Sequence, residues 1–124
     1  ILDCSGVENA ASLENEFFGP VLSVVGFDTE AEALALANDT AFGLASGVFT
    51  KSLTRAHRMI RGIQAGIVWV NTYRAVSPIV PFGGHGLSGH GREGGLQAAL
   101  DYTNIKSVWL RTSDEPIPDP FVMR

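Results

Sequence analysis

The sequence predicts an α/β fold in which short strands and helices alternate as a parallel β-α-β-α-β unit. Three apolar runs have the length of strands, and they cover residues 21–25, 45–50 and 67–70. The two stretches between them carry apolar residues at helical spacing. Strands that alternate with helices in this order are expected to pair in parallel, through right-handed crossovers.

The first helix is expected to begin at Thr29. The Thr29 hydroxyl and the Glu32 carboxylate have the spacing of a capping box, in which two side chains satisfy free amides at the start of a helix. Leu34 continues the helix, and the Asn-Asp-Thr sequence that starts at Asn38 can end it.

The second helix is expected to begin at Ser52 and to stop at Gly62. Four apolar side chains at spacings of three and four share one face of it: Leu53, Ala56, Met59 and Ile60. Three arginines lie on the other side and are most simply a solvated face: Arg55, Arg58 and Arg61.

After Asn71 the regular pattern stops. Residues 72–95 are rich in Gly, Pro and Ser, which predicts a long ordered loop of the kind that usually has a function. A short helix is expected over residues 96–100 and a last strand over residues 105–110, before a Pro-rich tail.

Composition narrows the classes of function. The 124 residues suit one domain, and 45% hydrophobic residues are typical of a soluble globular protein. A net charge of −4 argues against a nucleic-acid partner, and no apolar run is long enough for a membrane span. The single cysteine, Cys4, excludes an internal disulfide and predicts a reducing, cytoplasmic location. The start at Ile1, without Met, predicts that the chain is cut from something longer.

Two features resemble binding sites of other kinds, a glycine pattern and a set of histidines. Residues 84–89 fit the G-x-G-x-x-G pattern of a dinucleotide phosphate loop, but such a loop directly follows a strand and opens a helix. Here we expect the glycines to permit tight turns instead. The three histidines do not form a metal constellation, so no metal site is predicted: they are His57, His85 and His90.

Four stretches together resemble the aldehyde dehydrogenase superfamily, in order and mutual spacing as well as in content. The similarity runs from about Ile1 to Trp109. The stretches are Glu16-Phe17-Phe18-Gly19-Pro20, Ala41-Phe42-Gly43-Leu44 running into Val48-Phe49-Thr50, Ala65-Gly66-Ile67-Val68-Trp69-Val70-Asn71, and Pro81-Phe82-Gly83-Gly84 followed by Ser88-Gly89-His90-Gly91-Arg92-Glu93.

The resemblance implies a piece of an enzyme that oxidises a small aldehyde to a carboxylic acid with NAD or NADP. Residues 1–103 would be the carboxyl-terminal part of the catalytic domain, and residues 104–124 an oligomerisation strand and tail. The family's nucleophilic cysteine lies far upstream of the Glu16 motif, so Cys4 is expected to be a buried apolar residue and the segment inactive by itself, with no catalytic residue. The homo-oligomer contact would use Ile105, Lys106, Ser107, Val108, Trp109 and Leu110.

The same resemblance assigns site residues. It implies that Glu16 binds the nicotinamide ribose and that Phe18 packs beside the nicotinamide ring. Val76 and Phe82 would line the substrate pocket, although a buried core aromatic is an equal alternative for Phe82. Arg74 also falls where the family varies its pocket. For Arg92 and Glu93 the family role is support of proton movement, and the alternative we favour is an ion pair that holds the loop.

Two other functions remain open. The chain could be a non-catalytic module that recruits a partner strand through residues 105–110, because an unpaired strand edge attracts other strands. It could also be a stand-alone nucleotide binder that uses the glycine loop.

Overall fold

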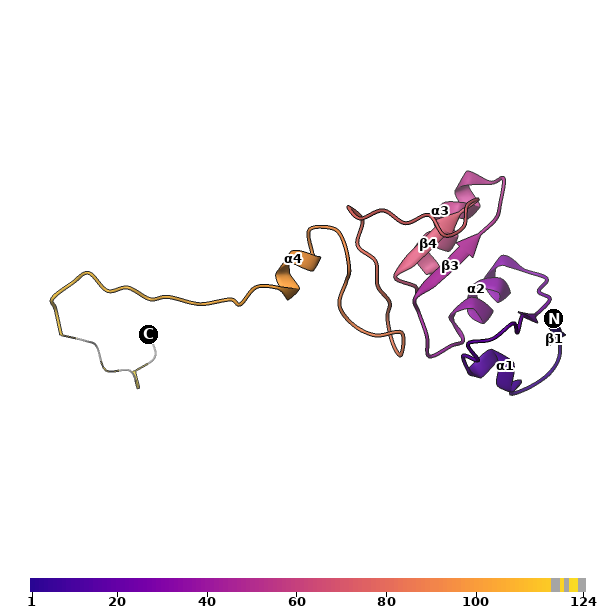
Figure 1. The fold of residues 1–124 in the computed structure, drawn as a ribbon, viewed down its shortest axis with the longest axis horizontal. Coiled ribbons are helices and arrows are strands. Elements are labelled where there is room, and N and C mark those ends of the chain that lie inside the picture. The colour runs from indigo at the N-terminus through magenta and orange to yellow at the C-terminus, as the bar shows by residue number, and fades with distance from the viewer. Residues whose placement is uncertain (117–118, 120, 123–124) are drawn as a thin grey trace.

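The computed structural model describes residues 1–116, 119 and 121–122 (Figure 1). Helices and strands alternate over the first seventy residues, and a long irregular segment then leads to one short helix. In chain order the elements are β1 (Leu2–Asp3), α1 (Ala11–Glu14), β2 (Ser23–Val24), α2 (Glu30–Asn38), β3 (Ala45–Val48), α3 (Leu53–Gly62), β4 (Ile67–Val70) and α4 (Ala98–Asp101).

Both strand pairs of the described chain are parallel, as the alternating pattern predicts. β3 and β4 pair over four residues each, from Ala45 opposite Ile67 to Val48 opposite Val70. The prediction of one sheet through all three strands is not confirmed, because β2 pairs with β1 in a separate sheet. β1 was not predicted, because a two-residue strand is too short to leave a pattern in the sequence.

The helix α2 begins where the capping residues predict. The Thr29 hydroxyl accepts a hydrogen bond from the Glu32 amide at 3.2 Å. The Glu32 carboxylate accepts from the amide of Asp28 at 2.9 Å, one residue earlier than in a standard capping box. At the other end, the Asn38 side chain donates to the Gly62 carbonyl and accepts from the Gln64 amide, each at 2.9 Å, which ties α2 to the end of α3.

The helix α3 also begins at its predicted cap, where the Ser52 hydroxyl accepts from the Arg55 amide at 3.3 Å. Its buried face differs from the prediction. Ala56 and Met59 are buried, but Leu53 is 74% and Ile60 is 41% exposed, and Ile63 takes the third buried place. The buried face of the helix is therefore narrower than its apolar residues suggest.

The arginines of α3 are exposed, as predicted, but two of the three also form ion pairs. Arg55 and Arg58 both bind Glu30 of α2, with Nε–carboxylate distances of 3.1 and 2.6 Å. Gly62 likewise has a packing role, since a Cβ atom there would come within 2.9 Å of two side-chain carbons of Leu34. A glycine at this point lets α2 and α3 approach closely.

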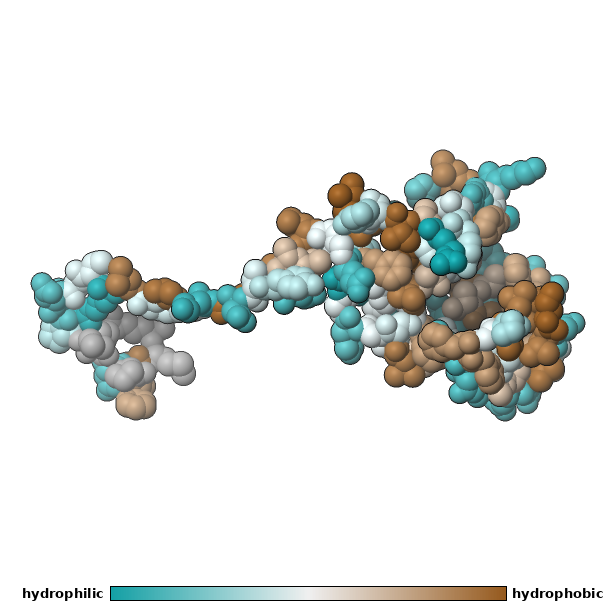
Figure 2. Space-filling view, viewed as in Figure 1, coloured by the Kyte–Doolittle hydropathy of each residue, from teal (hydrophilic) through white to brown (hydrophobic). Residues whose placement is uncertain are grey.

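The core is small for a chain of this length. Among the described residues only four hydrophobic side chains are buried: Cys4, Ala56, Met59 and Ile63. The accessible surface is 10743 Å², against about 6,400 Å² for a compact protein of this mass. Apolar side chains lie on several parts of the surface (Figure 2).

The segment after α4 runs away from the body in an extended form (Figure 1). Residues 105–110 were expected to be a strand, but within this single chain they carry no strand pairing. Ile105 and Trp109 are 97% and 96% exposed. Pairing of this segment with a second chain stays a prediction, because an extended segment becomes a strand only when another strand bonds to it. No helix in the described part of the chain is long and apolar enough to cross a membrane.

Candidate functional site

The irregular segment after β4 is tied to the end of β3. The Asn71 amide donates to the Val48 carbonyl at 2.9 Å. The Asn71 side chain then pairs with the Thr50 backbone, accepting from its amide at 2.8 Å and donating to its carbonyl at 2.9 Å. These three bonds hold Asn71 in the left-handed region, with φ of +52°, and set the direction in which the chain leaves the sheet.

The two residues predicted for the substrate pocket, Val76 and Phe82, line the same hollow. Its volume is about 260 Å³, and it opens beside the start of β4. The other lining residues, which the sequence analysis did not predict, are Ile67, Ala75, Ser77, Val80 and Pro81. The wall is almost wholly apolar, and Val76 is 66% exposed, so it lies at the rim. A hollow of this kind suits the apolar part of a small ligand.

Phe82 is held by the backbone of Glu93. The Phe82 amide donates to the Glu93 carbonyl and the Glu93 amide donates to the Phe82 carbonyl, both at 2.7 Å. This two-way bond brings the two ends of the glycine loop together and leaves the Glu93 side chain exposed. Phe82 is half-buried, so it is neither a fully buried core aromatic nor a free surface side chain.

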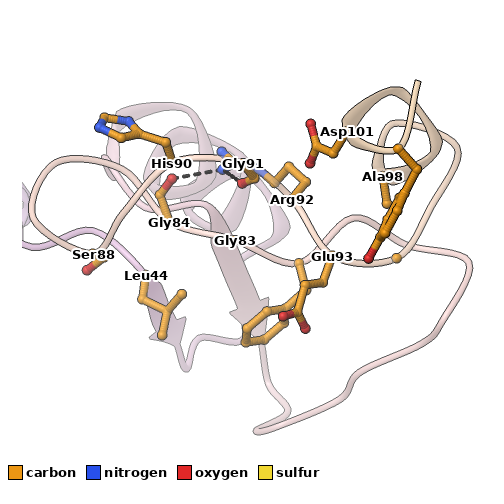
Figure 3. A pocket seen from close by; sticks show the side chains of 13 residues that line it. Leu44, Gly83, Gly84, Ser88, His90, Gly91, Arg92, Glu93, Ala98 and Asp101 are labelled. Carbon is orange, nitrogen blue, oxygen red and sulfur yellow. Dashed lines mark hydrogen bonds between the residues drawn. The ribbon is translucent and has the colours of Figure 1, made fainter. Parts of the chain in front are cut away.

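The ion pair expected between Arg92 and Glu93 is not what holds the loop. The Arg92 guanidinium instead donates to the carbonyls of Gly84 at 2.8 Å and Gly91 at 2.6 Å (Figure 3). The side chains of adjacent residues point in different directions. The Arg92 side chain folds back over the glycine loop, where it binds the two carbonyls. A second, open hollow of about 680 Å³ lies between this loop and α4.

The glycine pattern of residues 84–89 is a turn and not a phosphate loop, as expected. Gly86 and Gly89 have φ of +57° and +102°. The His85 and Leu87 amides donate to the carbonyls of Gly43 and Ala41 at 3.0 and 2.9 Å. Amides that bind the chain in this way are not free to bind a phosphate, and the next helix, α4, begins only at Ala98.

Glu16 and Phe18 lie on the turn between α1 and β2, away from the Val76 hollow. Both side chains are exposed, Phe18 to 92% of its surface. Phe18 has φ of +45°, an uncommon conformation for a bulky residue. Both residues border a shallow hollow of about 300 Å³ that also involves Ser12 and Leu22.

A family model described as "Aldehyde dehydrogenase family" matches residues 5–108. This chain belongs to the aldehyde dehydrogenase family. A (Z)-2-((N-methylformamido)methylene)-5-hydroxybutyrolactone dehydrogenase of Acinetobacter baylyi is 72% identical to it over all 124 residues, which are 25% of that protein. A betaine aldehyde dehydrogenase of Vibrio vulnificus is 49% identical over 109 residues, 88% of this chain and 22% of that protein.

Solved structures show the same relationship. PnpE from Pseudomonas sp. WBC-3 matches 85% of this chain with a TM-score of 0.76 and 50% identity. The P. syringae indole-3-acetaldehyde dehydrogenase AldA, solved with NAD⁺, matches 86% with a TM-score of 0.78 and 48% identity. Each match takes up 22% of the solved chain. The chain thus spans about a quarter of the length of the curated relatives it matches.

The one cysteine of this aldehyde dehydrogenase chain is buried. Cys4 is 6% exposed, and its Sγ lies 3.4 Å from the Ser12 Oγ. A nucleophilic thiolate needs to be reached by substrate, so the prediction of a buried, small apolar role for Cys4 fits its position. Among the described residues, no three His, Cys, Asp or Glu side chains gather as metal ligands would.

The chemistry of Glu16 and Phe18 suits the nicotinamide-ribose end of a dinucleotide. An exposed carboxylate can accept hydrogen bonds from the two hydroxyls of a ribose, and an exposed flat ring can pack beside the nicotinamide. Glu16 and Phe18 offer these two groups on one turn. The shallow hollow of about 300 Å³ beside them has room for that end and not for a whole dinucleotide.

Proposed function

We propose that this chain is part of an NAD(P)-dependent aldehyde dehydrogenase, to which it contributes one edge of the cofactor site and one wall of the substrate site. The observation that carries the proposal is the shared hollow of Val76 and Phe82, the two residues for which the family resemblance implies substrate contact. Solved relatives that contain NAD support the choice of cofactor.

Glu16 would hold the nicotinamide ribose and Phe18 would limit rotation of the ring. When bound, NAD or NADP supplies the hydride acceptor. The contribution of these two residues is placement, because a carboxylate and a flat apolar face fix the orientation of the group that they contact. The nucleophilic thiolate and the general base would come from other parts of the whole enzyme.

The isolated 124-residue chain is therefore expected to show no aldehyde oxidation. A nicotinamide absorbance assay with aliphatic and aromatic aldehydes measures this, beside a Cys4→Ser variant. Activity that is present in the pure chain and absent in Cys4→Ser would contradict the proposal. Activity equal in both would identify contaminating full-length enzyme.

We further propose that the substrate is the open form of a hydroxylactone, as the name of the Acinetobacter relative suggests. A 5-hydroxylactone opens to a chain with an aldehyde at one end and a carboxylate at the other. Betaine aldehyde is instead a quaternary ammonium cation, which proteins bind in cages of several aromatic rings. Among the described residues, the hollow has one ring, Phe82, and the cation Arg74 stands one residue before its lining residue Ala75.

The experiment compares two substrates in the whole dehydrogenase that contains this chain. Succinic semialdehyde carries the aldehyde and the carboxylate, and betaine aldehyde carries the positive charge. We expect kcat/KM to be at least about tenfold higher for succinic semialdehyde, because a favourable charge contact is worth on the order of 1.4 kcal/mol. Equal values would contradict the proposed substrate class, and no oxidation of any aldehyde would contradict the proposed enzyme.

Self-association is a second function, and the exposed segment of residues 105–110 favours it. Its apolar side chains have no cover within the described chain, and an extended edge of this kind recruits another strand. We propose that two copies of the protein pair here, and that the protein acts in the cytoplasm, where a single free cysteine is stable.

A further inference from the structure

The segment that forms the rim of the apolar hollow is strained. Arg74 has φ of +57°, and Asn71, three residues earlier, has φ of +52°. A residue with a Cβ atom loses roughly 1 kcal/mol or more in this conformation. Such conformations persist only where surrounding contacts determine them, and they concentrate at functional sites. The conformation of Arg74 therefore depends on contacts made by its neighbours.

Trp69 makes those contacts. Its indole Nε1–H donates to the carbonyl of Ala75 at 2.8 Å, across a span of six residues. The Tyr73 ring meets the Trp69 ring edge to face, with centroids 5.7 Å apart and an angle of 71° between the planes. Arg74 lies between these two anchored residues, so the backbone of residues 73–75 is held on both sides.

The strand position of Trp69 explains why it can hold this segment. Side chains two residues apart on a strand share a face, so Trp69 lies on the same face of β4 as Ile67. Ile67 lines the hollow together with Ala75 and Val76. The residue of β3 opposite Trp69 is Gly47.

We infer that Trp69 is a positioning residue that sets substrate specificity by fixing the rim of the hollow, an inference that rests on the proposed function. Trp69 itself does not line the hollow. It acts through Ala75, whose carbonyl it holds, and through Val76, which follows directly. The segment is thereby a preformed wall against the part of the substrate remote from the aldehyde carbon.

The first test is limited trypsin digestion of the whole dehydrogenase, because Arg74 places a cleavage site inside the held segment. Cleavage in a folded protein follows the population of locally open forms. Trp69→Phe keeps a ring and removes the N–H donor, and loss of one hydrogen bond raises that population about fivefold. We expect cleavage after Arg74, followed by mass spectrometry, to accelerate by about that factor. Tyr102→Phe, which also removes one ring donor and lies outside both the hollow and residues 105–110, is the control and should match the parent, since Tyr102 is 90% exposed.

The second test is a steady-state comparison of a long and a short aldehyde with the same variants. Trp69→Phe should raise KM for succinic semialdehyde about fivefold, and leave its kcat and the KM for acetaldehyde within about twofold, because only the longer substrate reaches the wall. Tyr73→Leu, which removes the edge-to-face partner, should act in the same direction. A general loss of folding would instead lower kcat for both aldehydes.

The outcomes separate the two proposals. Unchanged cleavage after Arg74 in both variants overturns the inference, whether or not the protein oxidises aldehydes. Faster cleavage with equal effects on both aldehydes also overturns it, and leaves the proposed function in place. A parent protein that oxidises no aldehyde overturns the proposed function, and the wall assignment with it.

Discussion

Two short apolar segments of this chain each carry a tryptophan, and they have opposite surroundings. β4 pairs with β3 along its whole length, and its Trp69 binds Ala75 and packs against Tyr73. Residues 105–110 have a similar composition, but Trp109 is 96% exposed. The difference shows that an apolar, extended sequence forms a strand only where another strand is available to pair with it.

The molecule has a group of residues whose contacts lie within the chain and a group that is exposed in it. The first group includes β3, β4, the helix α3 and the segment up to Gly95. The second includes the turn of Glu16 and Phe18 and the extended residues 105–110. Substitutions in the first group should change the stability of the protein, and those in the second should change its activity or association.

The largest expected effect is at Gly66, which lies between β4 and the glycine loop. A Cβ atom there would overlap with the carbonyl of Gly83, a backbone atom that cannot move aside cheaply. We expect Gly66→Ala to lower the free energy of unfolding by about 3 kcal/mol or more, measured by denaturant titration of the whole protein.

Gly47→Ala is the matched control in the neighbouring strand. Its new Cβ atom would meet only the Phe49 ring, at an ordinary 3.7 Å. A change below about 1 kcal/mol is expected there, since a strand accepts alanine. If Gly66→Ala were as stable as Gly47→Ala, the glycine loop would not pack on β4 as described.

The next effect concerns Glu16, whose side chain is exposed in this chain. Glu16→Gln keeps the shape and removes the charge that would bind the nicotinamide ribose. We expect kcat of the whole enzyme to fall roughly tenfold or more, because a misplaced reactive group loses rate even when binding is retained.

The melting temperature should not change, since Glu16 has no role in holding the described chain. Glu14→Gln, two residues away in α1 and also exposed, is the control for a general loss of negative charge. Unchanged turnover in Glu16→Gln, with unchanged stability, would show that the assigned cofactor role is wrong.

A smaller effect is expected from acid. The Arg58 guanidinium, by its hydrogen bonds, and then Arg55 lower the pKa of the Glu30 carboxyl from 4.5 to about 2. A carboxyl whose pKa is lower in the folded state stabilises the fold above its unfolded pKa, and the contribution is lost as the pH falls towards the folded value. The loss should therefore occur between pH 4.5 and about 2.

Glu30→Gln should remove this part of the acid sensitivity, seen as a flatter melting temperature against pH in that window. The Glu30 side chain is 29% exposed, so solvent screening keeps the effect modest. Glu115→Gln, in the exposed segment, should follow the parent curve. A Glu30→Gln curve parallel to the parent would show that the α2–α3 ion pairs do not form in solution.

The smallest effect on stability is expected in the extended segment. Val108→Lys should leave the melting temperature of the protein at low concentration unchanged, because Val108 is 76% exposed. It should weaken self-association, measured by light scattering after size-exclusion chromatography, since a charge on a strand edge opposes pairing. A lower melting temperature without any change in association would mean that the segment packs on its own chain.

Much of the local structure could be predicted from the sequence. Thr29 and Ser52 begin their helices as expected, because a hydroxyl cap and the amide it bonds are three residues apart. The pairing of β2 with β1 and the binding of Glu30 by two arginines were not predicted, because each joins residues separated by more than twenty positions.

The candidate site was predictable only in part. The family resemblance pointed to Val76 and Phe82, and the structure brings them to one hollow. The bond from Trp69 to Ala75 left no signal in the sequence, because its acceptor is a backbone carbonyl that every residue has.

By itself the sequence determined where the helices begin, which runs are extended and which glycines permit turns. These features depend on a few neighbouring residues and on the backbone angles that each allows. Only the tertiary structure decided which strands pair, which face of α3 is buried and which segment forms the wall of the hollow. Those outcomes depend on contacts between distant residues, and residues 105–110 show that without a partner the same local pattern stays unpaired.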